Sequence, residues 1–267
     1  MIPLKDNIKA QRTPFINYAI IGACSLVFLL QLGDPESVLV ERYGMIPRRV
    51  SEPGEPVLVE TVLHDFRGRP YLDRRAAEEP PFSAWWTLLT CIFLHGGWLH
   101  FLGNMWFLFI FGDNVEDHFG HVGYLAFYLV VGIAASAAHL LAGPASPIPT
   151  IGASGAIGGV MGAYLILYPR ATVLTLVPLF VIVEIIVLPA PIFLGIWFVL
   201  QLFPATMAIG ATTTGGVAWW AHVGGFVAGV LLVYVLRRSG LMPRHELDLL
   251  PRTGRISRYS RYGPWRR

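Results

Sequence analysis

The fold of this chain is decided by an uncharged stretch at residues 151–168, which reads IGASGAIGGVMGAYLILY. As an α-helix this stretch rises about 27 Å, close to the roughly 30 Å thickness of a bilayer's hydrocarbon layer. Ser154, Gly158 and Gly162 recur one helical turn apart, so the serine lies above a groove of almost bare backbone. Small-residue faces let transmembrane helices approach closely. The stretch therefore predicts a helix packed within a membrane bundle.

The rest of the chain has the same apolar character. Apolar residues make up 54% of its 267 residues and charged residues only 14%, where a soluble domain carries about 25%. Further apolar blocks lie at residues 14–33, 86–112, 122–142, 187–208 and 217–236. We therefore predict an all-α polytopic membrane protein with a bundle of six transmembrane helices. The composition excludes a disordered chain, a disulfide-rich secreted module and an ordinary soluble enzyme.

Positive charge sets the expected orientation. Six spans place both termini on one side, which carries 13 Lys and Arg residues against 7 on the other side. The positive-inside rule then puts both termini in the cytoplasm. An amino-acid composition rich in Arg, Ala and Gly favours a bacterial inner membrane. The expected parts are an N-terminal segment at 1–12, a membrane domain at 13–237 with an outer loop at 34–84, and a basic tail at 238–267. The tail suits a lipid surface rather than nucleic acid.

Two connections lack the features of a span. Residues 171–187 are apolar but too short for a separate span, so we predict an interfacial or partly re-entrant connection. Asp113, Glu116 and Asp117, with the neighbouring His118 and His121, are predicted to form a solvated cytoplasmic loop.

Polar side chains fall inside several predicted spans, where ionisable groups are costly and usually functional. Ser154 lies about three residues into its span and His222 about five, which puts both near the outer ends of their helices. The sequence His95-Gly96-Gly97 should interrupt the second span, so that its helix proper begins near Gly97. His100 and Asn104 then occupy the first two turns of that helix. Four polar groups from three helices therefore share one depth.

These groups can carry out nucleophilic chemistry. A serine hydroxyl needs a base within about 2.6–3.2 Å to become a nucleophile, and the spacing allows His222 to reach Ser154. His100 and Asn104 share a helix face, so both can donate hydrogen bonds to one developing oxyanion. A backbone N–H near Ser154 can add a third donor.

Three motifs lie in this order on alternate predicted helices. Residues 152–155 match a GxSG motif, residues 221–229 match AHxxGxxxG, and residues 95–105 match HGxxxHxxxNM, with Glu116 shortly after. Together they resemble the rhomboid intramembrane serine proteases. The resemblance covers about residues 13–237, and the three motifs in order are far more specific than GxSG alone.

The resemblance implies roles for individual residues. Ser154 is expected to be the nucleophile and His222 the general base, a dyad with no matching third carboxylate. His100 and Asn104, with the Ser154 backbone N–H, are expected to form the oxyanion hole. The possible supporting residues are His95, Gly152 and Gly155.

The resemblance also implies a function and its partners. The expected activity is that of an intramembrane serine endopeptidase, which cleaves peptide bonds in or next to transmembrane helices. Its expected partners are transmembrane protein substrates and membrane lipids. No metal, other cofactor or nucleic acid is implied. The alternative is a catalytically inactive rhomboid-like protein that binds membrane proteins, although such a protein should lack the nucleophile or the base.

Other sequence features bear on the alternative protein classes and on the remaining polar residues. A membrane zinc protease would need H-E-x-x-H, which the second span lacks, and a haem protein would leave the serine and asparagine motifs unexplained. Many rhomboids have Trp-Arg about nine residues before the first motif histidine, but here Thr87 follows Trp86, so the sequence does not predict the usual anchoring contact of the first loop. His139 is predicted to be an interhelical or interfacial hydrogen-bonding residue, and Glu184 a solvated or snorkelling carboxylate.

Overall fold

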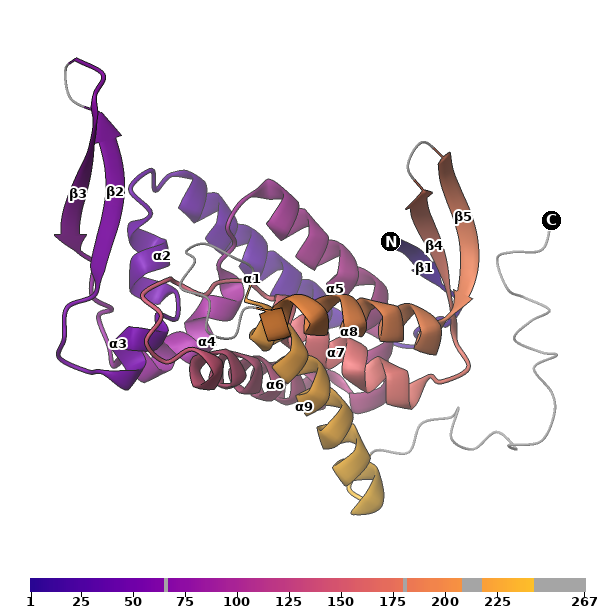
Figure 1. Ribbon diagram of the computed structural model, residues 1–267. Coiled ribbons are helices and arrows are strands. Elements are labelled where there is room, and N and C mark those ends of the chain that lie inside the picture. Colours follow the sequence, from indigo (N-terminus) through magenta and orange to yellow (C-terminus); the bar gives the residue numbers. More distant parts are fainter. Residues whose placement is uncertain (65–66, 180–181, 208–217, 243–267) are drawn as a thin grey trace.

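A computed structural model describes residues 1–64, 67–179, 182–207 and 218–242 (Figure 1). Most of the basic tail predicted at 238–267 lies outside these residues. The long helices are α1 (Phe15–Leu32), α5 (Trp98–Phe119), α6 (His121–Ala142), α7 (Ser154–Leu167), α8 (Ala190–Met207) and α9 (Trp219–Arg238). Shorter helices occupy the connections: α2 (Val38–Tyr43), α3 (Pro47–Ser51), α4 (Thr87–Thr90), and the 3₁₀ turns η1 (Ala84–Trp86) and η2 (Cys91–Phe93).

Three of the described helices, α1, α6 and α9, are long and apolar enough to cross a membrane. The chain is therefore mostly helical and has the character of a membrane protein, but the six predicted spans are not confirmed. Helix α7 is apolar yet only 14 residues long, or about 21 Å. It is buried among other helices along most of its length, which fits a helix that meets protein rather than lipid.

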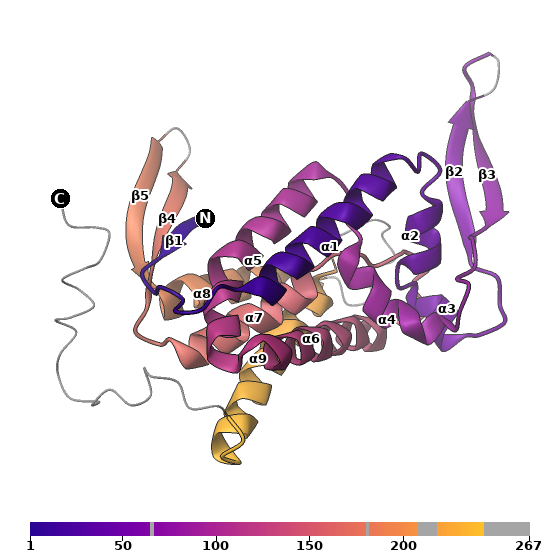
Figure 2. The same ribbon diagram turned by 180° about the vertical axis from the view of Figure 1, so that it is seen from behind.

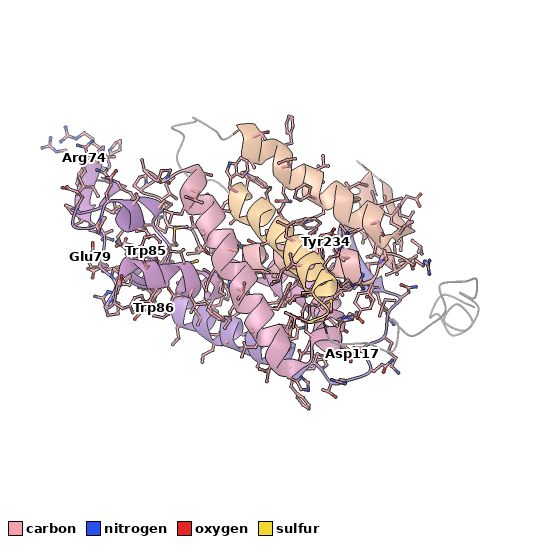
Figure 3. The ribbon with its side chains drawn as sticks, turned by 90° about the horizontal axis from the view of Figure 1, so that it is seen from below. Arg74, Glu79, Trp85, Trp86, Asp117 and Tyr234 are labelled. Carbon is pink, nitrogen blue, oxygen red and sulfur yellow. The ribbon has the colours of Figure 1, made fainter. Side chains whose placement is uncertain are left out.

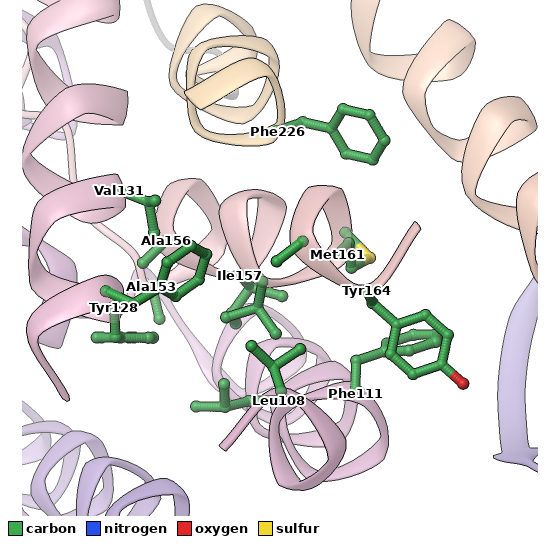
Figure 4. Packing of buried hydrophobic residues seen from close by; sticks show 14 of the residues in the cluster. Leu108, Phe111, Tyr128, Val131, Ala153, Ala156, Ile157, Met161, Tyr164 and Phe226 are labelled. Carbon is green, nitrogen blue, oxygen red and sulfur yellow. The ribbon is translucent and has the colours of Figure 1, made fainter. Parts of the chain in front are cut away.

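The core surrounds α7 (Figure 4). Ile157 and Met161 of this helix are almost fully buried, and Leu108 and Phe111 of α5 belong to the same hydrophobic cluster. Figure 4 shows Val131 of α6 and Phe226 of α9 on other sides of α7. The predicted start of the second-span helix near Gly97 is confirmed, because α5 begins at Trp98.

Helices α7 and α9 touch through bare backbone, as the small-residue pattern predicted. A Cβ added to Gly225 would lie 1.9 Å from the Gly155 carbonyl oxygen, and one added to Gly229 would lie 2.0 Å from the Gly159 oxygen. At Gly158 the added carbon would lie 2.9 Å from the carbonyl oxygen of His222. A side chain at any of these glycines would therefore force the two helices apart.

Gly225→Ala should accordingly destabilise the protein by about 1–3 kcal/mol, because the added methyl group overlaps a backbone carbonyl that cannot rotate away. Gly22→Ala is the matched control, since a Cβ added at this glycine of α1 would meet no heavy atom within 4 Å apart from its neighbours and its own helix backbone. The measurement is the melting temperature of both purified variants in the same detergent. Equal melting of Gly225→Ala and the wild type would show that α7 and α9 are farther apart than described.

Two antiparallel sheets correct the all-α prediction. Strands β1 (Ile2–Asp6), β4 (Thr172–Leu179) and β5 (Ile182–Pro189) form one sheet in the order β1-β4-β5, and β2 (Leu58–His64) pairs with β3 (Pro70–Ala76) in the other. The sheets project from opposite ends of the helical bundle (Figures 1 and 2). The predicted re-entrant connection at 171–187 is thus a hairpin, because its many β-branched residues favour strands and Pro178 disfavours a helix.

The acidic segment predicted as a solvated loop instead continues α5 to Phe119. The buried Glu116 carboxylate accepts hydrogen bonds from the backbone N–H groups of Ile16 (2.9 Å) and Asn17 (2.7 Å). Asp117 accepts from the N–H of Gln11 at 2.9 Å. The first N–H groups of a helix lack internal acceptors, so these carboxylates satisfy the start of α1 and order the chain before it.

Asp6 ties β1 to the bundle. Its Oδ2 accepts hydrogen bonds from the Tyr164 hydroxyl at 2.5 Å and from Asn114 Nδ2 at 2.9 Å. The side chain is buried, and this burial raises the pKa of Asp6 from 3.8 to about 7, although the Tyr164 hydrogen bond acts in the opposite direction. The folded chain therefore binds this proton more tightly than the unfolded chain.

This raised pKa predicts a loss of stability with increasing pH. Below pH 3.8 the carboxyl is protonated in both states, whereas between about pH 4 and 7 the unfolded state releases its proton first, which favours unfolding. Asp6→Asn should flatten this part of the curve and melt at a higher temperature than the wild type above pH 7. Melting temperatures from pH 5 to 8 test this, with Glu55→Gln, which removes an exposed carboxylate, as the control. Parallel curves for Asp6→Asn and the wild type would contradict the assignment.

The first loop is anchored by Glu41 rather than by a Trp-Arg pair. Trp86 and its neighbour Trp85 are 62% and 63% exposed (Figure 3). The Arg75 guanidinium donates to both Glu41 carboxylate oxygens, at 2.7 and 2.9 Å, and the Glu78 N–H donates at 2.9 Å. Burial alone would raise the pKa of Glu41, but these bonds and the charge of Arg75 bring its pKa below the ordinary value. The loop thus has a contact that the sequence pattern did not reveal.

Candidate active site

The structure brings Ser154 and His222 into hydrogen-bond contact. The distance between Ser154 Oγ and His222 Nε2 is 2.6 Å. Ser154 is the first residue of α7, and His222 lies in the first turn of α9. The glycine contacts between these helices set their separation, so the two side chains meet without a long reach.

The backbone before α7 is shaped by Gly152. Its φ of +126° lies in the region that favours glycine, and an added Cβ would lie 2.6 Å from the His100 ring. The Gly152 N–H donates to the Cys91 carbonyl oxygen at 2.9 Å, which ties this loop to η2. Gly155, the second residue of α7, allows close contact with Ala135 and Ala221. Both glycines therefore hold the serine in place through backbone geometry.

His100 and Asn104 lie in the first two turns of α5, as predicted. The Gly96 N–H donates to His100 Nδ1 at 3.2 Å, so a neutral His100 ring carries its proton on Nε2, the atom that faces Gly152. The Asn104 side chain is buried, and its Nδ2 has no hydrogen-bond partner among the described residues. Unpaired buried donors are rare and call for an explanation.

The other ionisable residues that the sequence singled out have different surroundings. His95 is buried, and its backbone N–H donates to Gln31 Oε1 at 2.9 Å, while its ring lies edge-on to His100 at 5.4 Å. His139 Nδ1 has no partner among the described residues, and Glu184 is exposed on β5. In the described part of the chain no group of three or more His, Cys, Asp and Glu side chains could hold a metal ion.

One residue next to His222 was missed by the sequence reasoning. The Oε1 atom of Gln201, on α8, lies 2.7 Å from His222 Nδ1. Trp197, one turn earlier on α8, and Trp219 of α9 flank the imidazole with ring centroids at 6.1 and 5.9 Å. The available signal was an amide in an otherwise apolar helix, which is a functional hypothesis in a membrane protein.

Comparison with known proteins identifies the family of this helical membrane bundle with its Ser–His pair. The family described as Rhomboid domain matches residues 83–239, more than half of the chain. The chain therefore belongs to the rhomboid family.

Its relatives come from a plant and from a bacterium. It is 38% identical over 94 residues to RHOMBOID-like protein 5 of Arabidopsis thaliana, covering 35% of this chain and 29% of that protein. It is 28% identical over 162 residues to Rhomboid-like protein 11, chloroplastic, of the same plant, covering 59% and 54%. Over 81 residues it is 44% identical to Rhomboid protease GluP of Bacillus subtilis (strain 168), covering 30% and 15%. The matches thus span about a third to a half of the first two relatives, and they do not support a bacterial inner membrane in particular.

Proposed function

We propose that this rhomboid is an intramembrane serine endopeptidase that uses Ser154 as its nucleophile and His222 as its general base. The observation that carries the proposal is the 2.6 Å contact between Ser154 Oγ and His222 Nε2. A serine hydroxyl is a weak nucleophile until a base accepts its proton, and this distance suits that transfer. One bacterial relative is itself named a rhomboid protease.

The proposed reaction proceeds by acyl transfer. His222 Nε2 accepts the hydroxyl proton while Ser154 Oγ attacks the carbonyl carbon of the substrate peptide. The proton then passes from Nε2 to the leaving amine as the C–N bond breaks. A water molecule, activated by the same nitrogen, next hydrolyses the acyl-enzyme and regenerates Ser154.

Three N–H donors are proposed to stabilise the oxyanion. Asn104 Nδ2 is a buried donor that lacks a partner among the described residues, and His100 directs its Nε2 towards the loop that carries Ser154. The backbone N–H of Ser154 begins α7 and so has no acceptor within its own helix. Donors held in a site that excludes bulk water stabilise developing charge strongly.

The proposed substrate is a transmembrane segment of another protein. The apolar helices around the site suit lipid surroundings, so a substrate helix would enter laterally from the membrane. Its scissile carbonyl must leave its helical hydrogen bond before attack.

We also propose that the chain divides into an N-terminal segment at 1–12, a membrane domain at 13–237 and a basic tail at 238–267. The positive-inside rule supports termini in the cytoplasm and a site that opens towards the outer face.

Ser154→Ala and His222→Ala should each abolish cleavage of a model transmembrane substrate in liposomes, because neither variant retains an activated nucleophile. Both should melt near the wild-type temperature. Ser25→Ala is the control, since the hydroxyl of this serine of α1 donates to the Ile21 carbonyl oxygen of its own helix and its loss should leave activity intact. Turnover by folded Ser154→Ala would exclude the mechanism. Absence of cleavage and of fluorophosphonate labelling in the wild type would favour the inactive, substrate-binding alternative.

Asn104→Ala and His100→Ala should each lower the cleavage rate by about 10²- to 10³-fold, the usual effect of removing one oxyanion donor. Leu102→Ala, on the exposed side of the same helix, should keep the wild-type rate. Rates are measured with the same liposome substrate, and fluorophosphonate labelling reports whether Ser154 stays accessible. Wild-type rates in both donor variants would remove these side chains from the oxyanion hole.

A further inference from the structure

The proposed dyad requires one particular tautomer of His222. Ser154 can donate its hydroxyl proton only to a ring nitrogen that carries no hydrogen, and the nitrogen in contact is Nε2. A neutral imidazole has a single ring proton, so that proton must lie on Nδ1. Because His222 is buried, the Nδ1–H group needs an acceptor of its own.

Gln201 offers that acceptor. Its Oε1 lies 2.7 Å from His222 Nδ1, within the ordinary range for an N–H···O hydrogen bond. The imidazole is flanked by the rings of Trp197 and Trp219, which restrict its orientation. Packing by two aromatic rings fixes where the imidazole lies but does not choose which nitrogen is protonated. An amide oxygen can only accept a hydrogen bond, so it favours the tautomer with the proton on Nδ1.

We propose that Gln201 is a positioning residue that holds His222 in the tautomer with its proton on Nδ1. This inference rests on the proposed serine-protease function. When Nε2 takes the Ser154 proton, the imidazole becomes a cation, and its Nδ1–H then donates a stronger, charge-assisted bond to the same oxygen. Gln201 thus acts on His222 in the ground state and in the charged intermediate.

An amide suits this position better than a carboxylate. Soluble Ser–His hydrolases place a buried carboxylate on the corresponding nitrogen, but an ionised carboxylate within a membrane bundle is expensive. Gln201 presents a neutral acceptor on α8, an apolar helix that packs against α9 through the contact of Trp197 and Phe198 with Phe226. Among the described residues, Gln201 rather than a carboxylate contacts His222 Nδ1, so a neutral polar residue can take the third position.

Gln201→Leu keeps a side chain of similar size but removes the acceptor. It should lower kcat for the transmembrane substrate by about 10- to 100-fold, with KM little changed, because the loss concerns a hydrogen bond to a developing charge. Gln201→Glu keeps an acceptor oxygen at the same reach. Its charge is costly to bury alone but is paired with the imidazolium that forms, so this variant should recover most of the loss. Leu200→Ala, an exposed neighbour on the same helix, should retain the wild-type kcat. Equal losses in the Leu and Glu variants, or none in either, would overturn the proposal.

The tautomer can be measured without turnover. In full-length protein with ¹⁵N-labelled histidine, the His222 signals are assigned by their loss in His222→Gln. The wild type should show a protonated Nδ1 and an unprotonated Nε2, and Gln201→Leu should shift the equilibrium towards protonated Nε2 while the melting temperature stays near that of the wild type. A protonated Nε2 in the wild type would mean that the amide donates to Nδ1, and would overturn the proposal.

The two experiments separate this inference from the proposed function. If the wild type fails to cleave and to react with the fluorophosphonate probe, the protease function fails, but the tautomer measurement still tests the contact between Gln201 and His222. The positioning role alone fails if two results are found together. The wild type cleaves and Ser154→Ala does not, while Gln201→Leu has the same kcat and the same His222 tautomer as the wild type.

Discussion

The close approach of α7 and α9 is the constraint on which the rest of this structure depends. Gly225 and Gly229 lie directly against the carbonyl oxygens of Gly155 and Gly159. Since no side chain separates the two backbones, the first turns of both helices also lie close together, and Ser154 meets His222 there. The same contact that packs the bundle therefore sets the distance between Ser154 Oγ and His222 Nε2.

Buried polar groups lie at both ends of α5. At the end where the N-terminal segment docks, Asp6 and Glu116 accept hydrogen bonds from segments far away in sequence, and these bonds hold the chain together. At the opposite end of α5, His95 and Asn104 keep buried nitrogen atoms without partners among the described residues. The hydrogen-bonded carboxylates thus serve the fold, whereas the unpartnered nitrogens of His95 and Asn104 lie on either side of His100 in the sequence.

The segments that connect the helices make specific contacts of their own. Strand β1 pairs with β4, which is far from it in the sequence, and Glu41 stabilises the first loop by binding Arg75. Both contacts order segments that project from the two ends of the helical bundle.

The sequence by itself determined the apolar helices, the contact face of α7 and α9, and the residues that resemble rhomboid motifs, because helical periodicity and motif spacing are local properties. It did not determine the strands at 172–179 and 182–189, because β-branched residues in a short apolar run favour a strand only where a partner strand, here β1 for β4, is available. It also could not identify Gln201 as the neighbour of His222, or Glu41 as the loop anchor. These contacts join separate elements, so only the tertiary packing of α8 on α9, and of the loop on itself, decided them.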